Sequence, residues 1–111
     1  MKVLLTILDR ITLVDILPTQ GNYANMKLVR EMKERLSFNE EDHDAFGIKI
    51  LNNNGSITTT WNLDLDTGVD FEIGSRIEVM IKDELNTLNA DSKLTDAQCI
   101  LYEKFNMVNA D

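Results

Sequence analysis

Hydrophobic positions near the start of the chain recur every three or four residues, which is the spacing of an amphipathic helix. The apolar stripe lies between residues 3 and 17 and contains Leu4, Ile7, Leu8, Ile11, Val14 and Leu17. Pro18 ends the predicted helix, because proline disfavours helical geometry in the residue before it. The pattern therefore predicts a core helix over residues 3–17.

Two further helices are predicted before the period changes. Residues 23–36 repeat the helical spacing, and the side chains expected to face inward are Leu28, Val29, Met32 and Leu36. Ser37 and Glu40 have the spacing of a capping box, which predicts a short helix from there to about Phe46. Gly47 then provides the residue that commonly closes a helix.

The middle of the chain alternates with a period of two, which is typical of strands. The segments "IKIL" (48–51) and "SITTTW" (56–61) flank Asn54-Gly55, a strong hairpin signal. Residues 63–73 place apolar side chains at odd positions, except at Thr67, and acids at even positions, except at Gly68. This alternation predicts a strand with one face on a core and an acidic face in water.

Two helices are predicted in the last third of the chain. Capping-box pairs, Ser75 with Glu78 and Thr95 with Gln98, mark their starts. The first is expected to bury Ile77, Met80, Ile81, Leu85 and Leu88, and the second carries Ala97, Ile100, Leu101, Phe105 and Val108. The short polar linker "NADSK" predicts an antiparallel helical hairpin, and residues 107–111 are expected to fray.

The order of these elements predicts an α+β fold rather than an alternating α/β fold. N-terminal helices come first, a small antiparallel β-meander follows, and a C-terminal helical hairpin packs on one face of that sheet. A length of 111 residues suits a single domain over residues 1–111.

Composition excludes several function classes. The net charge is −8, from 19 acidic and 11 basic residues, so phosphate backbones and anionic membranes would repel the chain. We expect no direct nucleic acid binding and no membrane span, because no window approaches 18 uncharged apolar residues. Cys99 is the single cysteine, which rules out an internal disulfide and favours a cytoplasmic protein.

The tripeptide Asp66-Thr67-Gly68 matches the one that carries the catalytic carboxylate of aspartic proteases. Such a protease needs a mostly β chain, so that two of these loops meet across a dimer axis and their carboxylates share a proton. Here more than half of the chain is predicted to be helical. A turn uses the same residues for another reason, since Asp accepts local backbone hydrogen bonds and Gly supplies positive φ. We therefore interpret the tripeptide as a turn.

The sequence contains no complete set of residues for a metal site or for nucleophilic catalysis. A calcium loop that starts at Asp64 would place Val69 where glycine is required and Ser75 where glutamate is required. His43 with Glu40 supplies two ligands, whereas zinc takes three or four. Cys99 has no second cysteine or histidine near it in the sequence. The sequence thus predicts no catalytic residue, no cofactor and no metal, and a protein that is not an enzyme.

Acidic side chains are the interaction candidates. They are Asp64, Asp66, Asp70 and Glu72 in the alternating segment, and Glu40, Glu41, Asp42 and Asp44 in the short helix. They would meet a host or phage protein with a basic surface. A second hypothesis is a homo-oligomer through the first helix, whose stripe Leu5, Leu13 and Ile16 widen. A third is a nucleotide held by the cations of residues 27–35.

The segments "ILPTQGNY…LVREMKERLSFNEED" and "LNADSKLTDAQCILYEKF" carry a resemblance that spans most of the chain. With the tryptophan-bearing hairpin between them, they resemble small phage- and prophage-encoded proteins of unassigned activity. The resemblance implies a viral or integrated-element origin and a place of action in the bacterial host cytoplasm. It also implies a helper or host-directed role, such as inhibition of defence machinery.

Overall fold

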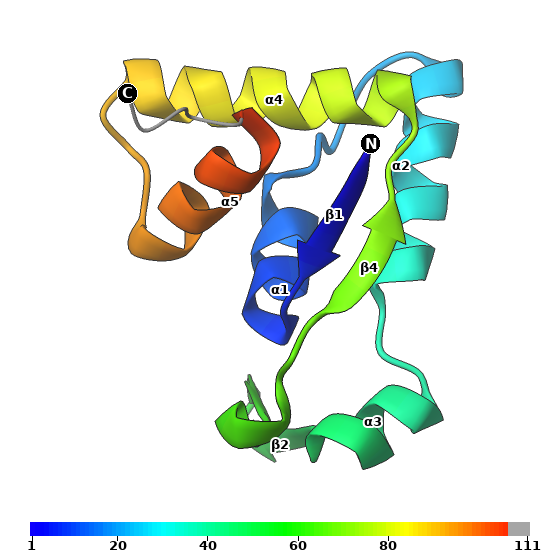
Figure 1. Cartoon of the computed structure of the whole chain (residues 1–111), viewed down its shortest axis with the longest axis vertical. Helices are drawn as coiled ribbons and strands as arrows, with labels where there is room; N and C mark the ends of the chain where they lie inside the picture. Colours follow the sequence, from blue (N-terminus) through cyan, green and yellow to red (C-terminus); the bar gives the residue numbers. More distant parts are fainter. Residues whose placement is uncertain (107–111) are drawn as a thin grey trace.

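The computed structural model describes residues 1–106, which fold into helices and two separate strand pairs (Figure 1). The helices are α1 (Ile7–Ile16), α2 (Tyr23–Leu36), α3 (Glu40–Phe46), α4 (Ser75–Ala90) and α5 (Asp96–Asn106). The strands are β1 (Lys2–Leu5), β2 (Lys49–Asn53), β3 (Ser56–Thr60) and β4 (Val69–Glu72), with a single 3-10 turn, η1 (Leu63–Leu65), before β4. The α+β class is confirmed. The expected fraying of residues 107–111, and the place of Val108 in the last helix, lie outside the described residues.

The main core lies between the β1–β4 pair and four of the helices. β1 and β4 are antiparallel, with Val3 opposite Phe71 and Leu5 opposite Val69. Val3, Leu5 and Phe71 are buried, whereas Leu4 points to the other face and is half exposed. Helical side chains complete this core: Leu13, Ile16, Leu17, Val29, Met32, Leu36, Ile77, Ile81, Leu85, Leu101 and Phe105. The sheet therefore buries one face, as the alternation predicts.

The first helix is shorter than the sequence predicts. Residues 2–5 are strand β1, and α1 begins at Ile7 because Thr6 and Asp9 form a capping box. The Thr6 side chain accepts from the Asp9 N–H, and the Asp9 carboxylate accepts from the Thr6 N–H. The helical spacing of the apolar residues in this segment cannot reveal that β4, more than sixty positions away, provides a strand partner.

The expected oligomer surface on the first helix is wrong for a related reason. Leu5, Leu13 and Ile16 lie inside the core of their own chain, with 0%, 0% and 8% of their surface exposed. Leu13 and Ile16 belong to α1, which packs against α2, α4 and α5, and Leu5 of β1 lies in the same core cluster. They form no apolar face for a second copy to cover.

The boundaries of α2 are confirmed, whereas two of the four predicted helix caps are wrong, those of Ser37 with Glu40 and of Ser75 with Glu78. Ser37 ends α2, and the N-cap of α3 is Asn39, which forms a capping box with Asp42. Gly47 closes α3 in the left-handed conformation, as predicted (φ 63°). The Thr95–Gln98 capping box is confirmed by reciprocal hydrogen bonds of 3.1 and 3.2 Å.

The predicted cap pair of Ser75 with Glu78 does not form. Gly74 is the N-cap of α4 and makes no side-chain cap hydrogen bond. Glu78 instead pairs with Lys82 at 2.8 Å and with the amine of Met1 at 3.6 Å. The amine of Met1 also donates to the Ile73 carbonyl and so extends the β1–β4 ladder. The Glu78 side chain therefore pairs with Met1 and Lys82 instead of forming the cap that its spacing from Ser75 predicts.

The alternating segment is not one strand of a meander. Residues 63–65 form η1, and only residues 69–72 form a strand, which pairs with β1 rather than with the hairpin. The single predicted sheet is therefore two two-stranded sheets, β1–β4 and β2–β3. Gly68 turns the chain between them at φ +84°, and a Cβ there would lie 2.9 Å from Leu4 Cγ. The positive φ that the turn interpretation expects at Gly68 is confirmed, but Asp66 accepts from the distant Ile7 N–H rather than from a neighbouring backbone group.

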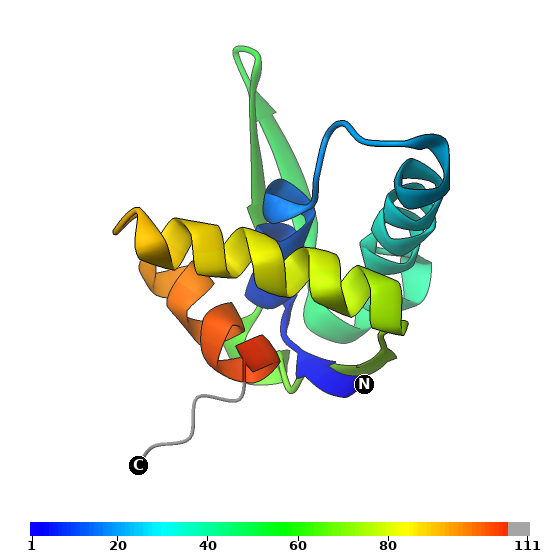
Figure 2. The same cartoon turned by 90° about the horizontal axis from the view of Figure 1, so that it is seen from above.

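The β2–β3 hairpin is confirmed and projects away from the helices (Figure 2). Its two-residue turn has positive φ at Asn54 (53°) and at Gly55 (88°), as a hairpin of this length requires. The C-terminal helices α4 and α5 pack against each other, and α5 also contacts α1. In Figure 1, α3, the hairpin and η1 lie below the body that the remaining helices and the β1–β4 pair form.

Candidate functional site

We define the lower lobe as residues 40–65, which comprise α3, the β2–β3 hairpin and η1. A small apolar cluster of Ile7, Phe46 and Ile48 connects it to the body, with Trp61 and Phe38 packed against its edge. The backbone also closes the lobe, because the Asn62 N–H donates to the Phe46 carbonyl at 2.9 Å. These contacts attach the lower lobe to the body at one end, while its hairpin extends into solvent at the other.

Exposed apolar side chains concentrate on the lower lobe. Of the ten large hydrophobic side chains that are exposed in the described residues, five belong to it: Ile50, Leu51, Ile57, Leu63 and Leu65. Ile57 and Leu63 are 72% and 76% exposed. Residues 50–63 contain no charged side chain, in a chain that is 27% charged. Single exposed leucines are ordinary, whereas such a group on one protruding element is not.

The pairing register sorts the hairpin side chains onto two faces. Ile50 lies opposite Thr59, and Asn52 lies opposite Ile57, so the two isoleucines are diagonal neighbours on one face. Leu51 lies opposite Thr58 on the other face. The isoleucine face is therefore the more apolar one, and nothing in residues 1–106 covers the outer part of it.

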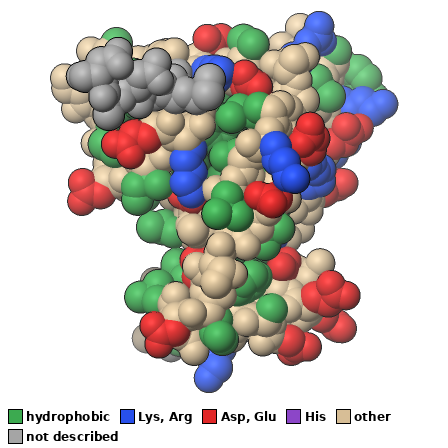
Figure 3. All heavy atoms as spheres, viewed as in Figure 1, with side chains coloured by type: hydrophobic (Ala, Val, Ile, Leu, Met, Phe, Trp, Pro, Cys, Tyr) green, Lys and Arg blue, Asp and Glu red, His purple; other side chains and the backbone are tan. Residues whose placement is uncertain are grey.

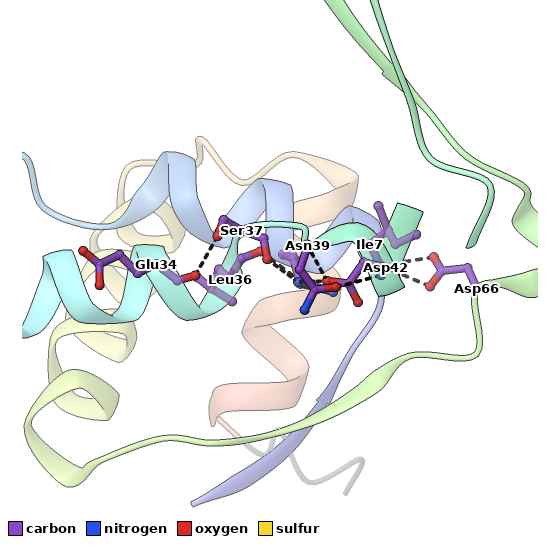
Figure 4. A network of polar contacts seen from close by, with 8 residues as sticks. Ile7, Glu34, Leu36, Ser37, Asn39, Asp42 and Asp66 are labelled. Atoms are coloured by element: carbon purple, nitrogen blue, oxygen red, sulfur yellow. Dashed lines mark hydrogen bonds and ion pairs between the residues drawn. The ribbon is translucent and has the colours of Figure 1, made fainter. Parts of the chain in front are cut away.

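The eight acidic candidates do not share one face. Those on the lobe surface are Glu40, Glu41 and Asp44 of α3 and Asp64 of η1. Asp70 and Glu72 are exposed on the outer side of β4, in the body, where Glu72 lies opposite Lys2. Asp42 and Asp66 point inward and accept hydrogen bonds (Figure 4). Figure 3 shows acidic side chains on both sides of the lobe and hydrophobic ones between them.

Asp42 belongs to a buried network around Arg10. The guanidinium is 3% exposed, and it donates to the carbonyls of Leu36 (3.1 Å) and Ser37 (2.8 Å) and to the Asp42 carboxylate (3.2 Å). It also stacks 4.5 Å from the centre of the Phe38 ring. The Arg10 side chain thus donates hydrogen bonds to the carbonyls at the end of α2 and holds the start of α3 through Asp42.

The pKa of Asp42 lies below its ordinary value of 3.8. Burial raises this pKa. The hydrogen bond from Arg10, the hydrogen bond from the Asn39 N–H and the positive charge of Arg10 lower it by more than burial raises it. A carboxylate whose pKa is lower in the folded state adds stability above the unfolded pKa and loses it as the pH falls through the folded pKa.

Replacing Asp42 with asparagine is therefore expected to flatten the pH dependence of stability below about pH 4. The free energy of unfolding of the wild type should fall between that pH and the lower folded pKa, and the variant should lose less in the same window. Urea unfolding at a series of pH values measures both curves. Glu41→Gln, an exposed neutralisation on the same helix, is the control, and equal slopes for Asp42→Asn and the wild type would contradict the assignment.

Asp66, the carboxylate of the protease-like tripeptide, is also a structural acceptor. Both of its oxygens lie 3.2 Å from the Ile7 N–H, at the first turn of α1. A negative charge is favourable there, because the unpaired N–H groups of a helix start carry partial positive charge. This contact joins residues 59 positions apart and holds η1 against the body.

Other candidate chemistry is not assembled in the described residues. No group of three His, Cys, Asp or Glu side chains is placed to hold a metal ion within residues 1–106. The His43 Nδ1 lies 3.2 Å from the Ile48 carbonyl, so this ring contacts the backbone at the base of the lobe. Cys99 is exposed on α5. None of the helices described is long and apolar enough to cross a bilayer.

The cations of α2 do not form one site. Arg35 reaches away to the Glu72 carbonyl at 2.6 Å. A shallow hollow of about 440 Å³ contains Arg30 and Lys33, but Glu34 lines it as well. The arrangement offers an anionic ligand two cations beside a carboxylate, in an open depression.

No family model, curated protein or solved structure matches the chain. Sequence reasoning chose the acids and overlooked the hairpin apolar residues, although one signal was readable: the charge-free run over residues 50–63.

Proposed function

We propose that this protein is a non-enzymatic accessory protein of the phage type that acts by binding another protein. One observation carries the proposal: the lower lobe exposes five large apolar side chains on and beside a charge-free hairpin. The expected place of action is the bacterial host cytoplasm. The resemblance to phage-encoded proteins favours a host system as the target, such as a defence enzyme that the bound protein would inhibit.

The lobe has the anatomy of a docking surface. Interface centres are depleted of charge and rich in apolar side chains, while their rims are polar. Ile50 and Ile57 supply such a centre, and the exposed acids of α3 and η1 supply the rim. An isolated two-stranded hairpin is marginally stable in water, so a partner that covers it would stabilise it. The acidic rim favours a partner with a basic surface.

Paired variants test this role. The protein is immobilised, a bacterial host lysate is passed over it, and any captured protein is then purified and its Kd measured. We expect Ile50→Ser/Ile57→Ser to abolish capture, because it removes the apolar centre. Glu40→Gln/Glu41→Gln should weaken binding and reduce its salt dependence.

Two controls carry the same chemical changes elsewhere. Ile100→Ser removes an exposed apolar side chain from α5, and Glu103→Gln neutralises an exposed acid on that helix. Both should bind as the wild type does. A partner that binds all four variants with equal affinity would overturn the docking role of the lobe.

A homo-oligomer is the second candidate. The buried stripe of α1 does not support it, but the outer edge of β3, which has no partner strand within residues 1–106, does.

A further inference from the structure

We infer that β3 pairs antiparallel with β3 of a second copy of this chain, so that two hairpins form a four-stranded sheet across a two-fold axis. This inference rests on the proposed role of the lower lobe as a docking element, and it names a partner for one edge of that lobe. Three features carry it: the free backbone edge, the absence of any device that guards that edge, and the distribution of charge.

The outer edge of β3 is free within residues 1–106, because β2 and β3 form a sheet of two strands. A two-residue turn makes Asn53 and Ser56 a hydrogen-bonded pair, and such pairs alternate along the hairpin. Ile57 and Thr59 therefore direct their N–H and C=O groups away from β2. These groups are a template for another strand.

Soluble proteins usually protect such an edge with lysine, proline, an inward charge or a bulge. The sequence of β3, Ser-Ile-Thr-Thr-Thr, contains none of these residues, and its pairing with β2 runs without interruption. By contrast, β2 begins with Lys49. The β-branched composition also suits a strand that pairs on both sides. Of the two hairpin edges, β3 is the one without protection.

The charge distribution is compatible with a second copy of β3 as the partner strand. Each chain carries a net charge of −8, so two copies that meet through their acidic surfaces would repel each other. The hairpin is uncharged from residue 50 to residue 60, and self-pairing there brings no like charges opposite each other. A five-residue strand is about 17 Å long, and repulsion is screened beyond about 8 Å at physiological ionic strength. Because the hairpin projects (Figure 2), the acidic bodies stay apart.

The register of the proposed β3–β3 pair follows from the backbone N–H and C=O groups of Ile57 and Thr59, which point away from β2. Ile57 of one copy pairs with Thr59 of the other in a hydrogen-bonded pair, which places Thr58 opposite its own copy on the two-fold axis. That central pair is not hydrogen-bonded, so its side chains approach closely. The axis is perpendicular to the sheet, and both copies present Ile50 and Ile57 on the same face. The dimer thereby doubles the apolar face that the proposed partner would cover.

A charge-swap experiment on the purified chain tests this register. Thr58 is exposed, so Thr58→Lys and Thr58→Glu should fold as the wild type does, which circular dichroism and thermal melting check. Sedimentation or light scattering across the micromolar to millimolar range should give the wild type twice the 12.7 kDa chain mass. Each variant alone should remain a monomer, because two like charges meet on the axis. An equimolar mixture of the two should recover the dimer.

The exposed position Asn86 on α4 provides the matched control: Asn86→Lys should leave dimerisation unchanged. A monomeric wild type, a dimer that survives Thr58→Lys, or a mixture that stays monomeric would each overturn the inference. None of these results depends on a heterologous partner. Loss of the dimer with partner binding intact would therefore separate this inference from the proposed function.

Discussion

Replacing Arg10 with methionine is expected to lower the free energy of unfolding by about 3 kcal/mol, the cost of breaking a buried ion pair by removing one partner. Methionine keeps much of the packing against Phe38 but donates no hydrogen bond. The carbonyls of Leu36 and Ser37 and the carboxylate of Asp42 would then lose their donor together. Urea unfolding followed by circular dichroism measures the difference.

Arg30→Met is the matched control, because Arg30 is exposed on α2. Substitutions at such positions usually change stability by less than about 0.5 kcal/mol. Arg10→Lys should be intermediate, since an ammonium cannot reproduce the planar fork that meets three acceptors and stacks on a ring. Equal stability of Arg10→Met and Arg30→Met would show that the network around Arg10 contributes little.

Replacing Phe105 with alanine is expected to cost about 4 kcal/mol, which is typical of truncating a buried aromatic side chain. Phe105 is 0% exposed and lies in the main core with Leu101 and Leu85. Its helix, α5, is the last element described, and it also supplies Lys104, which pairs with buried Asp9 of α1. The variant should therefore loosen the contact of α5 with α1 and lower Tm in a thermal melt.

Ile100→Ala provides the comparison within the same helix. The sequence predicts that Ile100 carries the apolar face of this helix, yet it is 44% exposed. Its truncation leaves no internal cavity, and we expect a change below about 1 kcal/mol. A loss as large as that of Phe105→Ala would mean that Ile100 is covered in solution, for example by a second copy of the chain.

The two networks serve the lower lobe in different ways. Arg10 fixes the start of α3 through Asp42, and Asp66 fixes η1 through the Ile7 N–H. Both contacts reach from α1 to opposite ends of the lobe, so that the hairpin projects from a base with fixed geometry. A docking element built in this way pays less conformational entropy on binding than a mobile loop would.

Part of the local chemistry was readable from the sequence, namely the hairpin turn and two of the four predicted helix ends. Asn54-Gly55 specified the hairpin, Gly47 closed α3, and Thr95 with Gln98 opened α5. Each of these signals depends on residues within four positions of one another, yet short range alone is not sufficient, because the equally local pair of Ser75 with Glu78 lost its acid to Met1 and Lys82. The apolar spacing of α2 and α4 was equally reliable, because a long periodic segment has few alternatives.

Contacts between distant residues decided the rest. Residues 2–5 have helical spacing, but a short apolar run adopts the structure that its partner offers, and β4 offers a ladder. Alternation over residues 63–73 could not show that Asp66 would accept from Ile7. Acidity alone does not tell a solvated carboxylate from one that caps a helix or pairs with a buried arginine. Charge and period along the chain thus determined the fold class and the helices, while the three-dimensional neighbours determined which strands pair and which side chains remain free to bind.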